Sequence, residues 1–254
     1  QLQVVVTDAL GRQQVLTQPY YSGTSLLRQD LAEYSVELGS VREDYGSRSF
    51  SYGDMIGVAS YRRGVTDALT AGARAEAQAN GTYALGADAA WQAGHAGIVT
   101  AQLAAGGDSS GAGFLTGFGV ERSGQTFSAF AQMQYASRSF AQSGMAELLF
   151  TPRQRTFGGF GLNLGQYGNA QLAYGLQSYY DAATAETIGV NYSVALGRLG
   201  YLGLYASQTL SNGGETNLLL TWSMALGDRR TLSASVQQSS VAPDLGGGLE
   251  ADVT

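Results

Sequence analysis

The sequence LTAGARAEAQANGTYALGADAAW, residues 69–91, decides the fold class of this chain. Before Asn80-Gly81, apolar residues alternate with small or polar ones, a period of two that is typical of a β-strand with one apolar and one polar face. The same alternation restarts after this dipeptide and continues to Trp91. Asn-Gly between two alternating runs predicts a β-hairpin, because both central residues of the tight turn must adopt a positive φ.

Similar alternation recurs along the chain and predicts about thirteen strands, each about ten residues long. A tilted strand needs about this length to cross the hydrocarbon core of a bilayer. The sequence therefore predicts an all-β chain: a small hairpin at residues 2–17, followed by an incomplete segment of an antiparallel transmembrane β-barrel. We place the barrel strands at residues 32–42, 52–62, 68–79, 82–92, 98–105, 113–122, 126–137, 154–165, 170–179, 186–196, 201–209, 216–226 and 231–238.

Composition excludes several other classes of protein. Only 13% of the 254 residues are charged and 36 are glycine, and no run approaches the roughly 18 to 20 apolar residues of a membrane-spanning helix. The net charge of −6 and the scattered basic residues argue against a nucleic-acid surface, which needs clustered cations to neutralise phosphates. The absence of cysteine removes disulfides and thiolate ligands.

The predicted connections fall into two sets that alternate along the chain. One set consists of short turns, and the other includes longer polar loops such as 106–113 and 180–186. We assign the long connection 137–153 to the short-turn end, as an exception. Short turns at one end and longer loops at the other are typical of a transmembrane barrel, with the short turns on the periplasmic side.

A soluble β-sandwich or β-solenoid would also show alternation. Its apolar face, however, must pack against another layer and normally carries bulkier side chains than the alanine-rich row at residues 69–79. Recurrent strand aromatics favour the interfacial girdles of a barrel, although ordinary cross-strand packing also uses them. These aromatics are Tyr34, Tyr61, Tyr83, Trp91, Phe127, Tyr135, Tyr174 and Tyr192.

Seven short motifs follow one another along the chain. They are LQVVVTDALGRQQ at 2–14, QPYYS at 18–22, SLLR at 25–28, YSV at 34–36 with Gly39, RGVTDALT at 63–70, GHAGIVTAQLAA at 94–105 and MALGDRRTLSAS at 224–235. In order and spacing, these motifs resemble the outer-membrane usher of chaperone–usher pilus secretion systems, from the end of the plug domain into the barrel. The resemblance covers residues 2 to about 240. In the last motif the chain has Ala225 where many members of the family carry a proline.

The resemblance implies a domain division and a function. Residues 1–30 would be the end of the plug domain with its linker, and residues 31–254 a barrel segment, so that the chain is an internal fragment of a longer protein of the Gram-negative outer membrane. The implied function is to assemble and secrete pilus subunits delivered by a periplasmic chaperone. The expected partners are these subunits, the chaperone–subunit complexes and outer-membrane lipid, with no cofactor, nucleic acid or small-molecule substrate.

A porin-like or autotransporter barrel, passing small solutes or a passenger, is the alternative function. The hairpin at residues 2–17 separates the two hypotheses. In an usher it is the tail of a plug, whereas a simple porin would begin with a barrel strand.

One motif could carry catalysis. Residues 107–111 match the G-x-S-x-G pattern, and His95 is the only histidine that could serve Ser109 as a base. The predicted strand 98–105 separates these two residues, and no helix follows the serine, so we expect no enzymatic activity. Glu43 with Asp44, or Asp108 alone, lack the repeated oxygen ligands of a calcium loop, and we expect no metal site.

The polar face of the predicted strands is the remaining candidate site. A wall with hydrogen-bonding groups and both signs of charge would let a polar protein slide through a pore without adhering. The alternative for any one of these residues is a solvated position with no specific partner. We expect the following residues to face the lumen: Arg74, Glu76, Gln78, Asp88, Gln102, Glu121, Gln132, Gln134, Asn163, Gln171 and Asn191.

Overall fold

The structure is a computed structural model, and it describes residues 3–7, 13–17, 26–42, 50, 52–143, 150–211, 214–225, 231–240 and 248–253. Three features of the sequence analysis therefore lie outside the described residues. They are the acidic pair Glu43 and Asp44, the motif at 18–22 and the middle of the motif at 224–235, residues 226–230.

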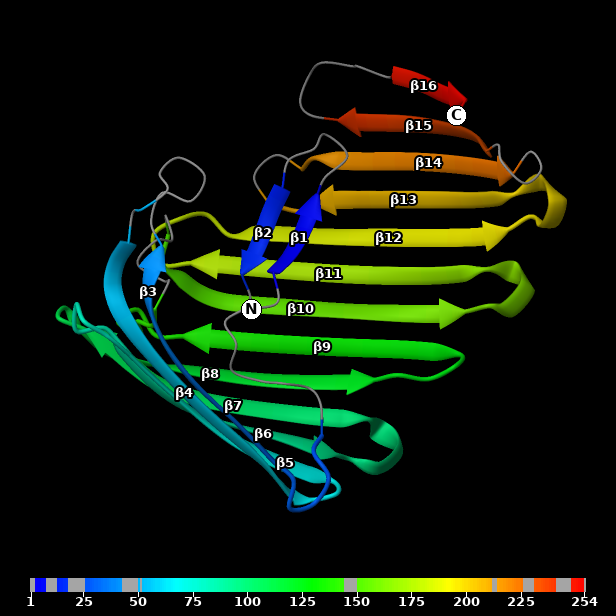
Figure 1. Ribbon diagram of the computed structural model, residues 1–254. Coiled ribbons are helices and arrows are strands. Elements are labelled where there is room, and N and C mark those ends of the chain that lie inside the picture. The colour runs from blue at the N-terminus through cyan, green and yellow to red at the C-terminus, as the bar shows by residue number, and fades with distance from the viewer. Residues whose placement is uncertain are drawn as a thin grey trace. The chain divides into compact units, whose positions relative to one another are not determined.

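The described residues form two β-sheets and three short 3-10 turns (Figure 1). The smaller sheet pairs β1 (Gln3–Thr7) with β2 (Gln13–Thr17). The larger has fourteen strands: β3 (Ala32–Arg42), β4 (Tyr52–Thr66), β5 (Leu69–Gln78), β6 (Tyr83–Gln92), β7 (Ile98–Asp108), β8 (Gly111–Arg122), β9 (Phe127–Ala136), β10 (Pro152–Asn163), β11 (Asn169–Tyr179), β12 (Ala185–Ala195), β13 (Tyr201–Thr209), β14 (Thr216–Ala225), β15 (Thr231–Ser240) and β16 (Gly248–Val253). The turns are η1 (Gly94–Ala96), η2 (Gly165–Tyr167) and η3 (Gly197–Leu199).

Strand order in the large sheet follows the sequence from β3 to β16, which confirms the predicted antiparallel meander and the separate hairpin before it. Each of the thirteen predicted strands corresponds to one strand of the sheet, and β16 is an addition. Among the described strands, β3 pairs only with β4 and β16 only with β15, so the sheet is unclosed and fits an incomplete β-barrel. No helix in the described part of the chain is long and apolar enough to span a membrane.

The chain divides into two compact units. Unit 1 comprises Gln1–Thr116 with Ser139–Ala146, and unit 2 comprises Gly117–Arg138 with Glu147–Thr254. The division falls within β8, and the segment of unit 1 that follows β9 belongs to the connection between β9 and β10.

In unit 1, one face of the strands exposes large apolar side chains. Leu38 in β3, Leu85 in β6 and Leu103 in β7 are 81%, 62% and 66% exposed. On the other face, Thr70 and Ala90 are paired across β5 and β6 and are buried. Soluble proteins rarely expose a contiguous apolar face, whereas a transmembrane sheet turns such a face to lipid.

Unit 2 shows the same division between its two faces. Phe160, Leu172 and Val190 are direct neighbours across β10, β11 and β12, and all three are exposed. The adjacent positions, Gln171 and Asn191, are also paired with one another but are polar and lie on the other face. The alternation that predicts the strands therefore separates one apolar face from one polar face.

The connection between β9 and β10 lies at the long-loop end, so the prediction that placed 137–153 at the short-turn end was wrong. In an antiparallel meander each strand reverses direction, and β9 and β11 therefore finish at the same end (Figure 1). The hydroxyl oxygen of Tyr135, near the end of β9, lies 3.1 Å from that of Tyr180, which follows β11. Counting strand reversals from the sequence alone would have placed the loop correctly.

Candidate functional site

The polar face of unit 1 carries a row of ion pairs. Arg62 in β4 lies between two carboxylates, with its Nη1 3.8 Å from Glu33 Oε2 and its Nε 3.9 Å from Asp88 Oδ2. The register places Gly72 directly between Arg62 and Asp88. A Cβ atom at Gly72 would lie 2.6 Å from Asp88 Oδ1 and 2.9 Å from Arg62 Cγ, so only glycine leaves room for this pair.

Glu76 joins this face to the connection between β9 and β10. Its Oε2 lies 3.4 Å from Arg74 Nη2, and its Oε1 accepts a hydrogen bond of 2.7 Å from the backbone N–H of Ser143. Phe140, in the same stretch, is buried. The backbone oxygen of Ala141 approaches Gly106 so closely that a Cβ atom on Gly106 would lie 2.3 Å from it. The polar face of β5 and β7 is therefore covered by this stretch and is not a uniformly solvated wall.

The motif at residues 63–70 binds the segment that leads into β3. Thr70 Oγ1 accepts a 2.8 Å hydrogen bond from the backbone N–H of Leu27, and Asp67 Oδ1 accepts one of 2.9 Å from Gln29. The motif arginine, Arg63, forms a 2.7 Å ion pair with the Asp30 carboxylate. Sequence reasoning identified this motif but missed its contacts, because nothing in the local pattern shows which segment these side chains bind.

Gly64 allows the segment that leads into β3 to lie directly against the backbone of this motif. Its backbone N–H donates to Leu31 O at 2.9 Å, and its own carbonyl accepts from the N–H of Asp30 at 2.9 Å. A Cβ at this position would lie 2.0 Å from Arg28 O. The motif therefore requires glycine next to its arginine for a steric reason.

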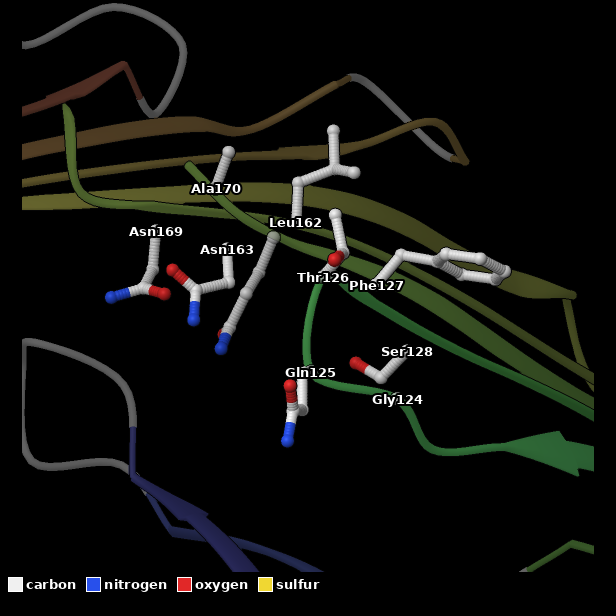
Figure 2. Close-up of a pocket in the computed structure, with 11 residues that line it drawn as sticks. Gly124, Gln125, Thr126, Phe127, Ser128, Leu162, Asn163, Asn169 and Ala170 are labelled. Atoms are coloured by element: carbon white, nitrogen blue, oxygen red, sulfur yellow. The ribbon is translucent and has the colours of Figure 1, made fainter. Parts of the chain in front are cut away.

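In unit 2 the polar face contains a small cavity at the short-turn end. Figure 2 shows the carboxamides of Gln125, Asn163 and Asn169 on the same side of the ribbon. The cavity volume is about 100 Å³, and none of the residues that line it is charged. This is far below the roughly 300 to 1,000 Å³ of ligand pockets, so the cavity offers polar contacts but no enclosed substrate site.

The structure brings the predicted polar residues together by register within each unit. In unit 1, Asp88 pairs with Gln102, and through Gly72 it shares a face with the polar row of β5; in unit 2, Gln171 pairs with Asn191. Glu121 is the penultimate residue of β8. That this face lines a lumen stays a prediction. The unit 1 set is Arg74, Glu76, Gln78, Asp88 and Gln102, and the unit 2 set is Gln132, Gln134, Asn163, Gln171 and Asn191.

Sequence reasoning missed two members of the unit 1 face, Glu33 and Arg62. Arg62 pairs with Gly72, and Glu33 pairs with Arg62, so both continue the row of β5 onto β4 and β3. The signal was available, because the period-two alternation of these strands assigns both residues to the polar side.

The candidate catalytic residues do not meet. His95 lies in η1, before β7, and Ser109 follows the last residue of β7, so all of Ile98–Asp108 separates them. Within the described ranges, no group of three or more His, Cys, Asp or Glu side chains could hold a metal ion.

The three 3-10 turns share one design at the short-turn end. Each begins and closes with glycines at positive φ, as in Gly197 at 61° and Gly200 at 89°. The backbone N–H of the residue before the turn donates to the closing glycine oxygen, as Leu196 does at 2.7 Å. The equivalent pairs in η1 and η2 are Ala93 with Gly97 and Leu164 with Gly168.

Two of these turns also receive an aromatic side chain. Trp222 Nε1 donates a 2.8 Å hydrogen bond to Leu199 O in η3, and Tyr192 Oη donates to Tyr167 O in η2. In both cases the aromatic side chain belongs to the strand that follows the hairpin. The turn η2 joins β10 to β11, and Tyr192 lies in β12; the turn η3 joins β12 to β13, and Trp222 lies in β14. Aromatics with one polar contact and an apolar body are typical of the membrane interface.

At the long-loop end of unit 2, Tyr180 and Asp181 are fixed by hydrogen bonds. Tyr180 Oη donates to Ala136 O at 3.0 Å, so at the 3.1 Å contact with Tyr135 the latter must donate. The hydrogen bond with Tyr135 raises the pKa of Tyr180, which stays protonated at neutral pH. Asp181 accepts hydrogen bonds from the backbone N–H and the Oγ1 of Thr151, at 2.9 and 3.0 Å.

The hydrogen bond from the Thr151 N–H lowers the pKa of Asp181 below its ordinary value of 3.8. Because the folded-state pKa is the lower one, this contact is complete above the unfolded-state pKa and is lost as the pH falls through the folded-state pKa. We expect the Thr151 amide resonance to titrate with a midpoint below 3.8 and to be independent of pH in Asp181→Asn. A midpoint at or above 3.8 would contradict the hydrogen bond.

Several solved structures are similar to this chain, among them one assembly intermediate and two pores. A chain of the cryo-EM structure of the E. coli P pilus tip assembly intermediate PapC-PapD-PapK-PapG, in its second conformation, matches 94% of this chain with a TM-score of 0.69 and 18% identity. Two structures of the P pilus usher PapC translocation pore match 93% and 91% of it, with TM-scores of 0.68 and 0.63 and identities of 17% and 16%. This chain has the fold of part of an usher pore.

This chain spans a third to a half of the length of the chains that it matches. This chain covers 32% of the matched chain in the assembly intermediate and 51% of the matched chain in each pore structure. No protein-family model and no curated protein matches the sequence.

Proposed function

We propose that this chain is the part of an outer-membrane usher through which pilus subunits, delivered by a periplasmic chaperone, are secreted and assembled. The observation that carries the proposal is the unclosed meander with one exposed apolar face, which has the fold of the PapC translocation pore over more than nine-tenths of its length. The apolar face would contact outer-membrane lipid, and the usher would act as a pore rather than as an enzyme.

Within this proposal, residues 1–30 are the end of the plug domain with its linker, and residues 31–254 belong to the barrel wall. Two observations support the division. The strands β1 and β2 pair only with each other among the described strands. The segment that follows is held against the motif at 63–70 by Thr70, Asp67 and Arg63, where the large sheet begins.

We further propose that the polar face lines the lumen along which subunits move. Its charges are largely matched within the wall, as in the contacts of Arg62 with Glu33 and Asp88 and of Arg74 with Glu76. A wall whose charges neutralise one another has little net field with which to hold a passing protein. Subunits would then be joined to one another by β-strand addition, which uses backbone hydrogen bonds and needs no cofactor.

The test uses neighbouring residues of β14 in the full polypeptide that contains this chain. Thr221→Cys lies on the polar face and Leu220→Cys on the apolar face, and the chain has no native cysteine. We expect a bulky, membrane-impermeant thiol reagent to modify Thr221→Cys and to stop fibre assembly by cells that carry the matching chaperone and subunits, while Leu220→Cys stays unmodified. Cells that never assemble fibres but gain solute permeability would favour the porin-like alternative.

A further inference from the structure

We infer that Arg138 and Arg153, at the long-loop end of unit 2, form a binding site for a phosphate group, and that the phosphate belongs to a glycolipid of the outer leaflet. The chemical class of the site follows from the side chains alone. Its assignment to a lipid rests on the proposed function, because that places the long-loop end at the cell surface.

Both guanidinium groups lie against one aromatic ring. The Cζ atoms of Arg138 and Arg153 are each 5.7 Å from the centroid of the Tyr180 ring. They reach it from different segments, since Arg138 follows β9 by two residues and Arg153 is the second residue of β10. Figure 1 shows that β9 and β11 end, and β10 begins, at the same edge.

The β10 bulge sets the position of Arg153. The register with β11 shifts between Pro152 and Gln154, which leaves Arg153 out of the regular pairing. A bulge of this kind re-aims a side chain that would otherwise alternate strictly. Arg153 and Arg138 are both exposed, unlike Arg155 two residues further along β10, which is partly buried.

The Tyr180 ring is held in place before any ligand binds. Its hydroxyl donates to Ala136 O and accepts from Tyr135, so both tyrosine hydroxyls are occupied and Tyr180 is fixed from two sides. We therefore treat Tyr180 as a positioning residue. A guanidinium group attracted to an aromatic ring keeps its N–H groups available for paired hydrogen bonds to phosphate oxygens.

Among the described residues, no carboxylate forms an ion pair with either of these two arginines. Both oxygens of Asp181, which also interacts electrostatically with Arg138, are engaged by Thr151. Two cations that share one aromatic ring repel each other, and a bound phosphate would relieve this repulsion. The chain as a whole has a net charge of −6, whereas Arg138 and Arg153 form a local positively charged patch.

The location of the cluster favours a lipid phosphate. Tyr135 continues the alternating row of β9 that includes Met133 and Ala129, and Ala129 pairs with Phe160 of the exposed apolar face. The cluster therefore stands where the apolar row of β9 ends, at the level at which lipid headgroups meet a transmembrane sheet. A phosphorylated headgroup could bind there while its acyl chains lie along the apolar face.

The experiment measures binding of the full-length protein, in detergent, to bisphosphorylated lipid A and to the same lipid after removal of its phosphates. We expect the wild type to bind the phosphorylated form about ten- to a hundredfold more tightly, because hydrogen bonds between charged groups are lost with the phosphates. The double variant Arg138→Gln/Arg153→Gln should lose this preference. Arg198→Gln should retain it, since Arg198 lies in η3 at the opposite end of unit 2.

Inorganic phosphate distinguishes the two sources of the ligand. If the phosphate belongs to a lipid, millimolar inorganic phosphate should neither bind measurably nor displace lipid A; if it binds as tightly as the lipid, the assignment to lipid is overturned. Equal binding of the two lipids by the wild type would overturn the site even if the double variant failed to fold. Fibre assembly in the same cells reports the proposed function separately, so loss of lipid preference with intact fibres would refute the site alone.

Discussion

Leu220→Arg is expected to destabilise the inserted protein by about 2 to 4 kcal/mol, because it places a charge near the middle of β14 on the exposed apolar face, which the proposed function assigns to lipid. Leu220 is a direct neighbour of Leu204 and Val236, and all three are exposed. In lipid an arginine at this position has no water and no anion within the apolar row. Its free energy of insertion therefore rises steeply with depth.

Thr221→Arg is the matched control, since it changes the next residue of the same strand to the same side chain. Thr221 pairs with Gly203 and Ser235 on the polar face, and an arginine there is expected to cost much less. Urea-induced unfolding of both variants from lipid vesicles gives the two free energies. If both variants lost the same free energy of unfolding, the two faces of β14 would be in the same environment, which would contradict the prediction.

Gly200→Ala is expected to destabilise the protein more than Gly197→Ala, although both change a glycine of the same turn. Gly200 has φ 89° and ψ −144°, a region used almost only by glycine, and holding an alanine in it costs about 1 to 3 kcal/mol. A Cβ there would also lie 1.9 Å from Ser223 O and 2.8 Å from Met224 Cα. Either the turn or its pairing with β14 must shift.

Gly197→Ala isolates the conformational part of this effect. Gly197 has φ 61°, and a Cβ there would meet no atom within 4 Å, so only the left-handed penalty of about 1 to 2 kcal/mol is expected. Unfolding of the two variants under the same lipid conditions should show the larger loss for Gly200→Ala. If the order were reversed, the contact between η3 and β14 would be contradicted.

The strands were predictable from sequence because alternation is a local property. The segment 201–209 was predicted with the bounds of β13, and 32–42 with those of β3. The assignment of each residue to a face follows from the same alternation, and Asp88 and Gln102, both assigned to the polar face, are direct neighbours in the sheet. A single period-two pattern thus determines both strand position and side-chain direction.

The contacts that fold segments onto the sheet were not predictable. The hydrogen bond from Leu27 to Thr70 joins residues 43 apart, and that from Ser143 to Glu76 joins residues 67 apart. Each depends on where a connection lies after the sheet has formed, and one buried carboxylate or hydroxyl in a strand does not reveal its partner. The wrong location of the 137–153 connection has another cause, a miscount of strand reversals, which the strand order of the meander corrects.

The shared glycine turn has a consequence for how such a sheet changes its width during evolution. Because η2 and η3 close with the same pair of positive-φ glycines and the same backbone hydrogen bond, a hairpin bounded by one turn could be duplicated or exchanged without redesigning the junction. Growth by such a unit adds two strands at a time. It therefore preserves the orientation of every later strand, and with it the even strand number that is usual in bacterial outer-membrane barrels.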